Sequence, residues 1–85
     1  MKSKVPVDKI LLSNLKVGDV AKIVSIENEN IFFRRRLIEM GLTKGVVVEI
    51  KKVAPLGDPV GIKLRGYELC LRKFEMKNIG VEVLK

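Results

Sequence analysis

Every second residue is apolar in several short segments of this chain, and turn residues separate the segments. In residues 46–53, Val46, Val48 and Ile50 fall on one face of an extended chain and Glu49 falls on the other. A period of two residues is the pattern of a β-strand with one buried face. The sequence predicts strands over residues 20–26, 46–53, 60–65, 67–71 and 79–83. The first of these is too mixed for clean alternation, which indicates a β-bulge or burial of both faces.

Residues 28–41 change to a helical period. Phe33, Leu37 and Met40 lie at positions i, i+4 and i+7, which share one face of an α-helix. The candidate N-caps are Asn28 and Asn30. Gly41 is expected to end the helix in the left-handed conformation of a Schellman motif, in which the next residue contacts Leu37. The sequence therefore predicts one short helix after the first strand.

A chain of 85 residues has room for a single domain. Residues 1–9 are polar and charged and predict a loose lead-in, so the domain is expected over residues 10–85. We expect a short turn over residues 14–16, capped by Ser13. Five short strands with tight turns must close around a shared core. We therefore expect a mainly β fold, a small, partly open SH3-like β-barrel of about five strands with one short α-helix.

Histidine is absent, and Cys70 is the single cysteine. Without histidine the chain cannot assemble a Ser-His-Asp or Cys-His arrangement, and it lacks the cysteine and histidine ligands of a zinc site. We therefore expect no enzymatic activity, no cofactor and no metal site. Because Cys70 lies between two leucines in a predicted strand, we expect its side chain to be buried or half-buried.

The apolar runs are all shorter than the ~20 residues of a membrane-spanning helix, and the run near the N-terminus is too short for a secretory signal. The sequence therefore predicts a cytoplasmic location without direct membrane insertion. The net charge of +7 suits nucleic acid, an anionic membrane face or an acidic protein, and it also serves solubility alone. The basic residues are spread along the chain, with one cluster at residues 34–36.

Several motifs occur in a fixed order along residues 12–83. They are Leu12-x-x-Leu15-x-x-Gly18, then Arg36-Leu37-x-x-Met40-Gly41-Leu42-x-x-Gly45, then Ala54-Pro55-Leu56-Gly57-Asp58-Pro59, and finally Leu71-Arg72 before Ile79-x-Val81. In this order they resemble the FeoA family of bacterial ferrous-iron transport accessory proteins. The chain departs from the family pattern at Phe74 and Met76, where a small residue is usual, and at Cys70.

The resemblance implies an SH3-like fold and a non-catalytic cytosolic protein of iron homeostasis. Its expected partner is FeoB, the membrane GTPase permease for Fe(II), which the chain would bind on the cytosolic side and modulate. The sequence has no GxxxxGK[ST] phosphate loop, so nucleotide chemistry would belong to the partner. The carboxylates are scattered and form no metal-binding motif.

Two segments supply the candidate partner-binding residues, which are Arg34, Arg35, Pro55, Leu56 and Asp58. The two arginines are expected to be exposed, and the proline-fixed loop is expected to present Leu56 to a partner. The loop also has a purely structural interpretation, in which Asp58 accepts hydrogen bonds from backbone amides. The motif residues that we assign to structure are Gly18, Arg36, Leu37, Met40, Gly41, Gly45, Pro59 and Gly66. Of these, Arg36 is expected to donate to backbone carbonyls of a neighbouring strand or loop.

Two alternatives stay open. A small basic barrel is also compatible with a nucleic-acid-binding module, although one tyrosine and three phenylalanines offer little base stacking. Open strand edges leave room for weak self-association or for docking to a repressor-like partner. Of the three, the FeoB-like permease is the expected partner, and we do not expect nucleic acid to be the main ligand.

Overall fold

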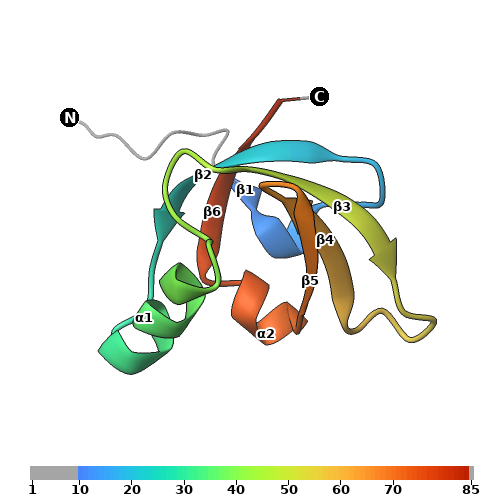
Figure 1. The fold of residues 1–85 in the computed structure, drawn as a ribbon. Helices are drawn as coiled ribbons and strands as arrows, with labels where there is room; N and C mark the ends of the chain where they lie inside the picture. The colour runs from blue at the N-terminus through green and yellow to red at the C-terminus, as the bar shows by residue number, and fades with distance from the viewer. Residues whose placement is uncertain (1–9, 85) are drawn as a thin grey trace.

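The computed structural model describes residues 10–84, and the predicted lead-in over residues 1–9 lies outside them. In chain order the elements are β1 (Ile10–Leu11), the 3-10 helix η1 (Leu12–Asn14), β2 (Val20–Ile26), α1 (Ile31–Glu39), β3 (Val47–Val53), β4 (Val60–Leu64), β5 (Tyr67–Leu71), α2 (Lys73–Met76) and β6 (Ile79–Val83). Figure 1 shows the strands curling over one core, with α1 and α2 together at one end of the molecule.

The described strands form one antiparallel sheet in the order β1-β6-β2-β3-β4-β5. Strands β1 and β5 are its edges, and they do not pair with each other within the described residues. The barrel is therefore partly open, and the prediction of a mainly β fold with one short helix is confirmed. The helix was expected after the first strand and follows the second, because β1 precedes the strand that was predicted to come first. The predicted irregularity in β2 is present as a register shift against β6 between Ile23 and Ser25.

Two local features differ from the sequence prediction. Strand β1 is a sixth strand, in which Ile10 pairs with Val81. It has no signal in the sequence because two residues cannot display an alternating pattern. The turn expected over residues 14–16 is instead η1, which begins at Leu12 because that side chain is fully buried in the core. Ser13 makes no capping hydrogen bond there.

The core is made of aliphatic side chains, as the alternation predicts. The two faces of β3 show this most clearly, since Val48 and Ile50 are buried whereas Val47 and Lys51 are exposed. The buried apolar residues are Leu12, Ala21, Ile23, Leu37, Leu42, Val46, Val48, Ile50, Val60, Ile62, Leu64, Leu71, Met76, Ile79 and Val81. Strands from both halves of the chain therefore share one core with the inner face of α1.

Local sequence determines both ends of α1. At its N-terminus the side chain of Asn30 accepts hydrogen bonds from the backbone N–H groups of Phe32 and Phe33, at 2.9 and 3.1 Å. At its C-terminus Gly41 has a φ of 99°, and the next backbone N–H donates to the Leu37 carbonyl at 3.1 Å. This is the predicted Schellman ending. Leu37 is fully buried, and the helix lies against the core through that side chain.

Candidate partner-binding surface

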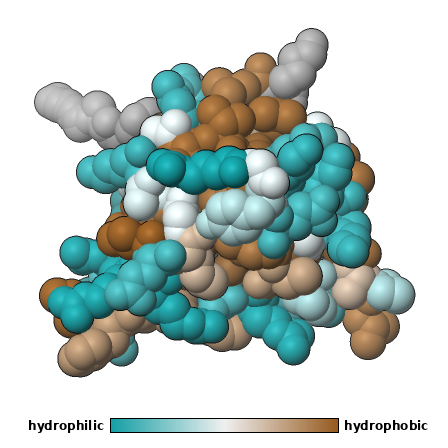
Figure 2. All heavy atoms as spheres, in the orientation of Figure 1, coloured by the Kyte–Doolittle hydropathy of each residue, from teal (hydrophilic) through white to brown (hydrophobic). Residues whose placement is uncertain are grey.

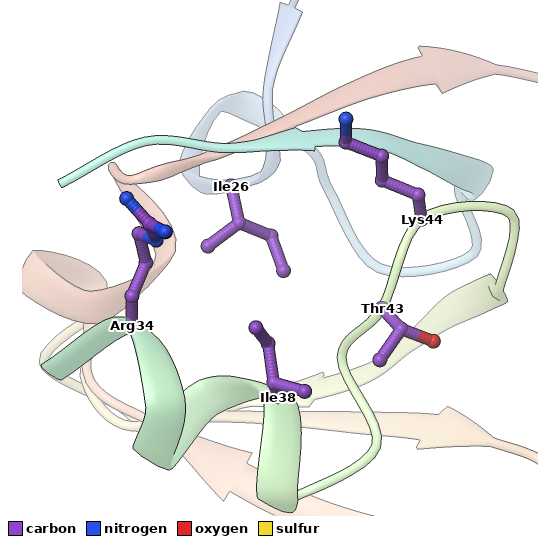
Figure 3. Close-up of a pocket in the computed structure, with 5 residues that line it drawn as sticks. All are labelled: Ile26, Arg34, Ile38, Thr43 and Lys44. Carbon is purple, nitrogen blue, oxygen red and sulfur yellow. The ribbon is translucent and has the colours of Figure 1, made fainter. Parts of the chain in front are cut away.

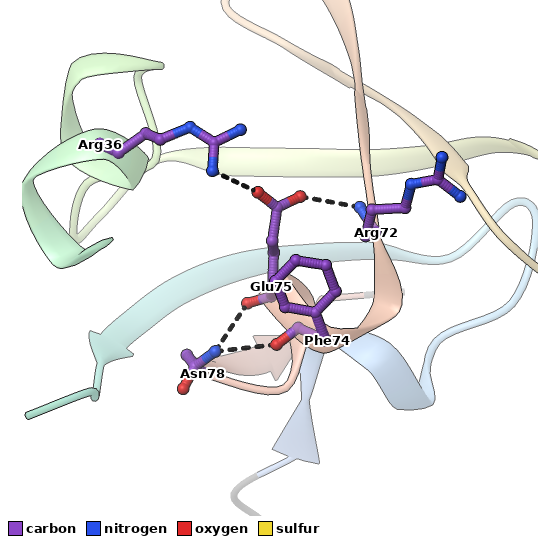
Figure 4. Close-up of polar contacts among 5 residues, drawn as sticks. All are labelled: Arg36, Arg72, Phe74, Glu75 and Asn78. Carbon is purple, nitrogen blue, oxygen red and sulfur yellow. Dashed lines mark hydrogen bonds and ion pairs between the residues drawn. The ribbon is translucent and has the colours of Figure 1, made fainter. Parts of the chain in front are cut away.

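Helix α2 carries the one buried charged side chain among the described residues, Glu75, which is 4% exposed. Its Oε2 lies 3.0 Å from Nη1 of Arg36 on α1, and its Oε1 accepts a hydrogen bond from the Arg72 backbone N–H at 2.8 Å (Figure 4). The prediction that Arg36 donates to backbone carbonyls is therefore wrong. A buried carboxylate is stable only with hydrogen bonds and an opposite charge, and Arg36 supplies the charge.

The N-terminal end of α1 is held to α2 by an asparagine pair and an aromatic pair. Asn28 donates from Nδ2 to Oδ1 of Asn78 at 2.9 Å, and Asn78 donates from its own Nδ2 to the Phe74 carbonyl at 2.9 Å. The rings of Phe74 and Phe33 stack with their centroids 6.3 Å apart. Phe74, one of the departures from the family pattern, is therefore a contact between the two helices.

The C-terminal end of α1 is held by the β4–β5 hairpin. Tyr67, the first residue of β5, donates a hydrogen bond from its hydroxyl to the Met40 carbonyl. The approach is close because Gly41 has no side chain, and a Cβ at that position would lie 2.5 Å from the tyrosine oxygen. Gly41 therefore has two roles. Its positive φ ends the helix, and its lack of a Cβ leaves room for the tyrosine hydroxyl.

The β3–β4 loop, residues 54–59, is attached to the other side of α2. Asp58 accepts a hydrogen bond from the Lys73 backbone N–H at 2.8 Å, and its second oxygen lies 3.7 Å from Nη1 of Arg72. A tight turn within the loop projects Leu56, which is 97% exposed. Asp58 thus attaches the loop to α2 through a backbone N–H group, while the side chain of Leu56 is exposed to solvent.

The structure divides the candidate residues into two groups instead of gathering them into one site. Arg34 and Arg35 lie on α1, whereas Pro55, Leu56 and Asp58 lie in the β3–β4 loop, and α2 lies between the two elements (Figure 1). Figure 2 shows hydrophobic atoms at both places, next to hydrophilic side chains at the α1 end. The two groups are therefore separate candidate surfaces.

A groove lies between α1 and the end of β2. Ile38 of α1 and Ile26 of β2 point toward one another across it, and Arg34 and Lys44 stand at its sides (Figure 3). Thr43 completes the described lining. An adjoining hollow is lined by Ile31, Arg34, Arg35 and Ile38. The groove therefore combines an apolar floor with cationic rims.

The apolar part of this surface and the charged contact beneath it were not predicted from the sequence. Ile31 and Ile38 flank the two arginines at helical spacing and were visible in the sequence, but the search for a core face selected the opposite side of the helix. Glu75 gave no signal, because its partner Arg36 is distant along the chain. The missed residues of the surface are Ile26, Ile31, Ile38, Thr43 and Lys44.

The described residues contain no group of three or more His, Cys, Asp or Glu side chains placed to hold a metal ion. Within the same range, no helix has the length and apolar character needed to cross a membrane. Cys70 is exposed, so the prediction of a buried or half-buried cysteine is wrong. The reason is its position, since it lies on the outer face of edge strand β5, where no strand covers it.

A six-stranded antiparallel sheet that curls over a single aliphatic core defines a small SH3-like β-barrel domain. The chain belongs to the FeoA family of ferrous iron transport, because the family model described as "FeoA domain" matches residues 10–83. The expected family and its SH3-like fold are thereby confirmed.

Three similar proteins agree with this assignment. A Fe(2+) transport protein A/Fe(2+) transporter FeoB fusion protein of Porphyromonas gingivalis is 38% identical over 86% of this chain, which covers 8% of that protein's length. A FeoA-like protein of Clostridium acetobutylicum has a TM-score of 0.85 at 39% identity, over 94% of this chain and 92% of the other. FeoA of Stenotrophomonas maltophilia, an SH3 domain protein solved with zinc, has a TM-score of 0.75 at 29% identity, over 86% and 89%.

Proposed function

We propose that residues 10–85 form one non-catalytic cytosolic domain that docks to a FeoB-like GTPase permease and modulates ferrous iron uptake. The observation that carries the proposal is the fusion protein of Porphyromonas gingivalis, in which a relative of this chain is joined to a FeoB transporter. Fusion keeps two domains at a high effective concentration. We infer that this domain has a surface that fits the permease.

The described surface supports docking better than chemistry. Its exposed apolar side chains include isoleucines on α1 and Leu56 in the β3–β4 loop, and cationic side chains lie beside those on α1. A domain of this kind acts on a partner only if it binds one state of that partner more tightly than another. The proposed mechanism is therefore a shift in the equilibrium between states of the permease, while any GTP hydrolysis remains a property of the permease.

Calorimetry with the cytosolic part of the same organism's FeoB-like permease tests this proposal. We expect saturable binding at physiological salt, and the difference in affinity with and without a GTP analogue gives the size of the shift between states. Absence of binding to any part of the permease would contradict the proposal. Salt-sensitive binding to RNA or DNA in its place would favour the nucleic-acid alternative, because contacts to phosphates weaken steeply with salt.

A further inference from the structure

The outer face of α1 has an unusual composition for the exposed side of a short helix. Ile31, Arg34, Arg35 and Ile38 lie at positions i, i+3, i+4 and i+7, and all four are exposed. The exposed fractions of the two isoleucines are 55% and 44%. Solvated helix faces are normally polar throughout, so exposed isoleucines at both ends of the stripe indicate an interaction surface.

The groove beside this face is shaped to receive a side chain. Ile26 and Ile38 face one another across it, and the aliphatic part of Thr43 lies near them (Figure 3). A side chain placed between the two isoleucines would be in apolar surroundings on both sides. Removing that apolar surface from water favours the insertion.

The cations around the groove form no ion pair with a carboxylate in the described part of the chain. Arg34 makes a long hydrogen bond of 3.5 Å to the Asn28 carbonyl, and neither Arg35 nor Lys44 forms an ion pair with a described carboxylate. The described lining of the groove includes two cations and no carboxylate. A ligand that carries carboxylates is therefore electrostatically complementary to this groove.

We propose that this groove binds an acidic segment of the permease, with one apolar side chain of that segment between Ile26 and Ile38 and carboxylates beside Arg34 and Lys44. The inference rests on the proposed function and adds the place of contact and the chemistry of the segment. The shape favours a protein segment over a membrane, because a flat bilayer surface does not enter a groove. It also disfavours nucleic acid, because no aromatic side chain lines the groove for base stacking.

The test measures binding of the full chain to the permease's cytosolic part, using two charge reversals at the rims, Arg34→Glu and Lys44→Glu, and Ile38→Ser on the floor. Lys16→Glu is the matched charge control, because it changes the net charge equally and precedes β2, whereas the groove lies where β2 ends. Val17→Ser is the matched apolar control, because Val17 is exposed and precedes β2. Leu56→Ser tests the other candidate surface. Circular dichroism confirms that each variant is folded.

We expect each groove variant to weaken binding about tenfold or more, which corresponds to about 1.4 kcal/mol, and the two controls to stay within about twofold of the unchanged chain. Equal binding by all groove variants, with loss only in Leu56→Ser, would overturn the groove assignment and leave the docking function standing. Failure of the unchanged chain to bind the permease would overturn both.

Vesicles of equal parts phosphatidylcholine and phosphatidylglycerol test whether the groove binds anionic lipid headgroups instead of carboxylates of the permease. We expect the chain to bind them weakly and Ile38→Ser to make no difference. Tight vesicle binding that is lost in Arg34→Glu, with no binding to the permease, would show that the groove faces lipid headgroups and would overturn the inference.

Discussion

Helix α1 and the β3–β4 loop both expose apolar side chains, but they are attached to the rest of the molecule in different ways. The helix is packed from beneath by Leu37 and joined to α2 through the nearly buried Glu75. The loop is joined to α2 mainly through Asp58, which is only half-buried. The α1 surface is therefore supported directly by the core, whereas the β3–β4 loop extends away from it.

Exposure alone does not define a docking surface. Leu56 is more exposed than any other large apolar side chain among the described residues, but it is not part of the described lining of the groove beside α1. The α1 surface has less exposed isoleucines that lie beside a groove and several cations. Specific binding needs apolar area and complementary charge in a fixed arrangement, and of these two regions α1 has both beside a groove.

The largest expected effect comes from the side chain beneath α1. Leu37→Ala is expected to lower the free energy of unfolding by about 2–5 kcal/mol, because it removes a fully buried side chain and leaves a cavity. Leu56→Ala, the matched change in the loop, is expected to stay within about 0.5 kcal/mol. Urea denaturation followed by circular dichroism measures both. Similar losses for the two variants would remove the contrast between the regions.

The next effect tests the close approach at the end of α1. Gly41→Ala and Gly45→Ala both place an alanine at a positive φ, which costs roughly 1–2 kcal/mol in either case. A Cβ at Gly41 also meets the Tyr67 hydroxyl, whereas one at Gly45 has no atom within 4 Å. We expect Gly41→Ala to cost about 1–3 kcal/mol more.

Thermal unfolding measures the difference in stability between Gly41→Ala and Gly45→Ala. The same comparison in a Tyr67→Phe variant tests whether the tyrosine hydroxyl causes that difference. Removing the hydroxyl takes away the atom that a Cβ at Gly41 would meet first. The excess cost of Gly41→Ala should therefore shrink when both changes are present. An unchanged excess would mean that contact with the tyrosine hydroxyl is not its cause.

A smaller effect distinguishes the two partners of the ion pair beneath α1. Arg36→Met leaves the buried Glu75 carboxylate without its charge partner, and we expect a loss of about 1–3 kcal/mol in the free energy of unfolding. Glu75→Gln should cost less, because the amide oxygen still accepts from the Arg72 backbone N–H and Arg36 remains solvated. Guanidinium denaturation compares the two. A larger loss for Glu75→Gln would contradict this ordering.

The smallest expected effect is on the attachment of the loop. Asp58→Ala removes the acceptor for the Lys73 backbone N–H at the start of α2, and we expect a loss of about 1 kcal/mol. Asp58→Asn keeps an acceptor oxygen and should be nearly neutral, because the ion pair with Arg72 is long and exposed. Thermal unfolding of both variants checks this. Equal losses would assign the attachment to charge instead of to the hydrogen bond.

Features that depend on neighbours in sequence were predictable from sequence. The alternation in residues 46–53, the asparagine cap of α1 and the Gly41 ending each act over a few residues, and the structure contains all three. The two-residue strand β1 was not predictable, because it exists only through its pairing with β6.

The candidate surface was predictable only in part, for the same physical reason. Exposure of Arg34 and Arg35 followed from their place outside the core stripe of α1. The groove was not predictable, because Ile26 and Ile38 meet only after β2 and α1 fold together. The ion pair between Arg36 and Glu75 likewise joins distant segments, and residue type alone does not select the partner.

Helix α1 is fastened at both ends, by the Asn28–Asn78 pair at its start and by the Tyr67–Met40 hydrogen bond at its finish. A helix held in this way has its final orientation before any partner arrives. The association rate of a partner at α1 should then be set by diffusional encounter and ionic steering, with no slower step of refolding, at about 10⁵–10⁷ M⁻¹s⁻¹ without steering. Tyr67→Phe removes the hydrogen bond at the C-terminal end of α1. We expect this change to alter the association rate constant of the complex more than it alters the choice of partner.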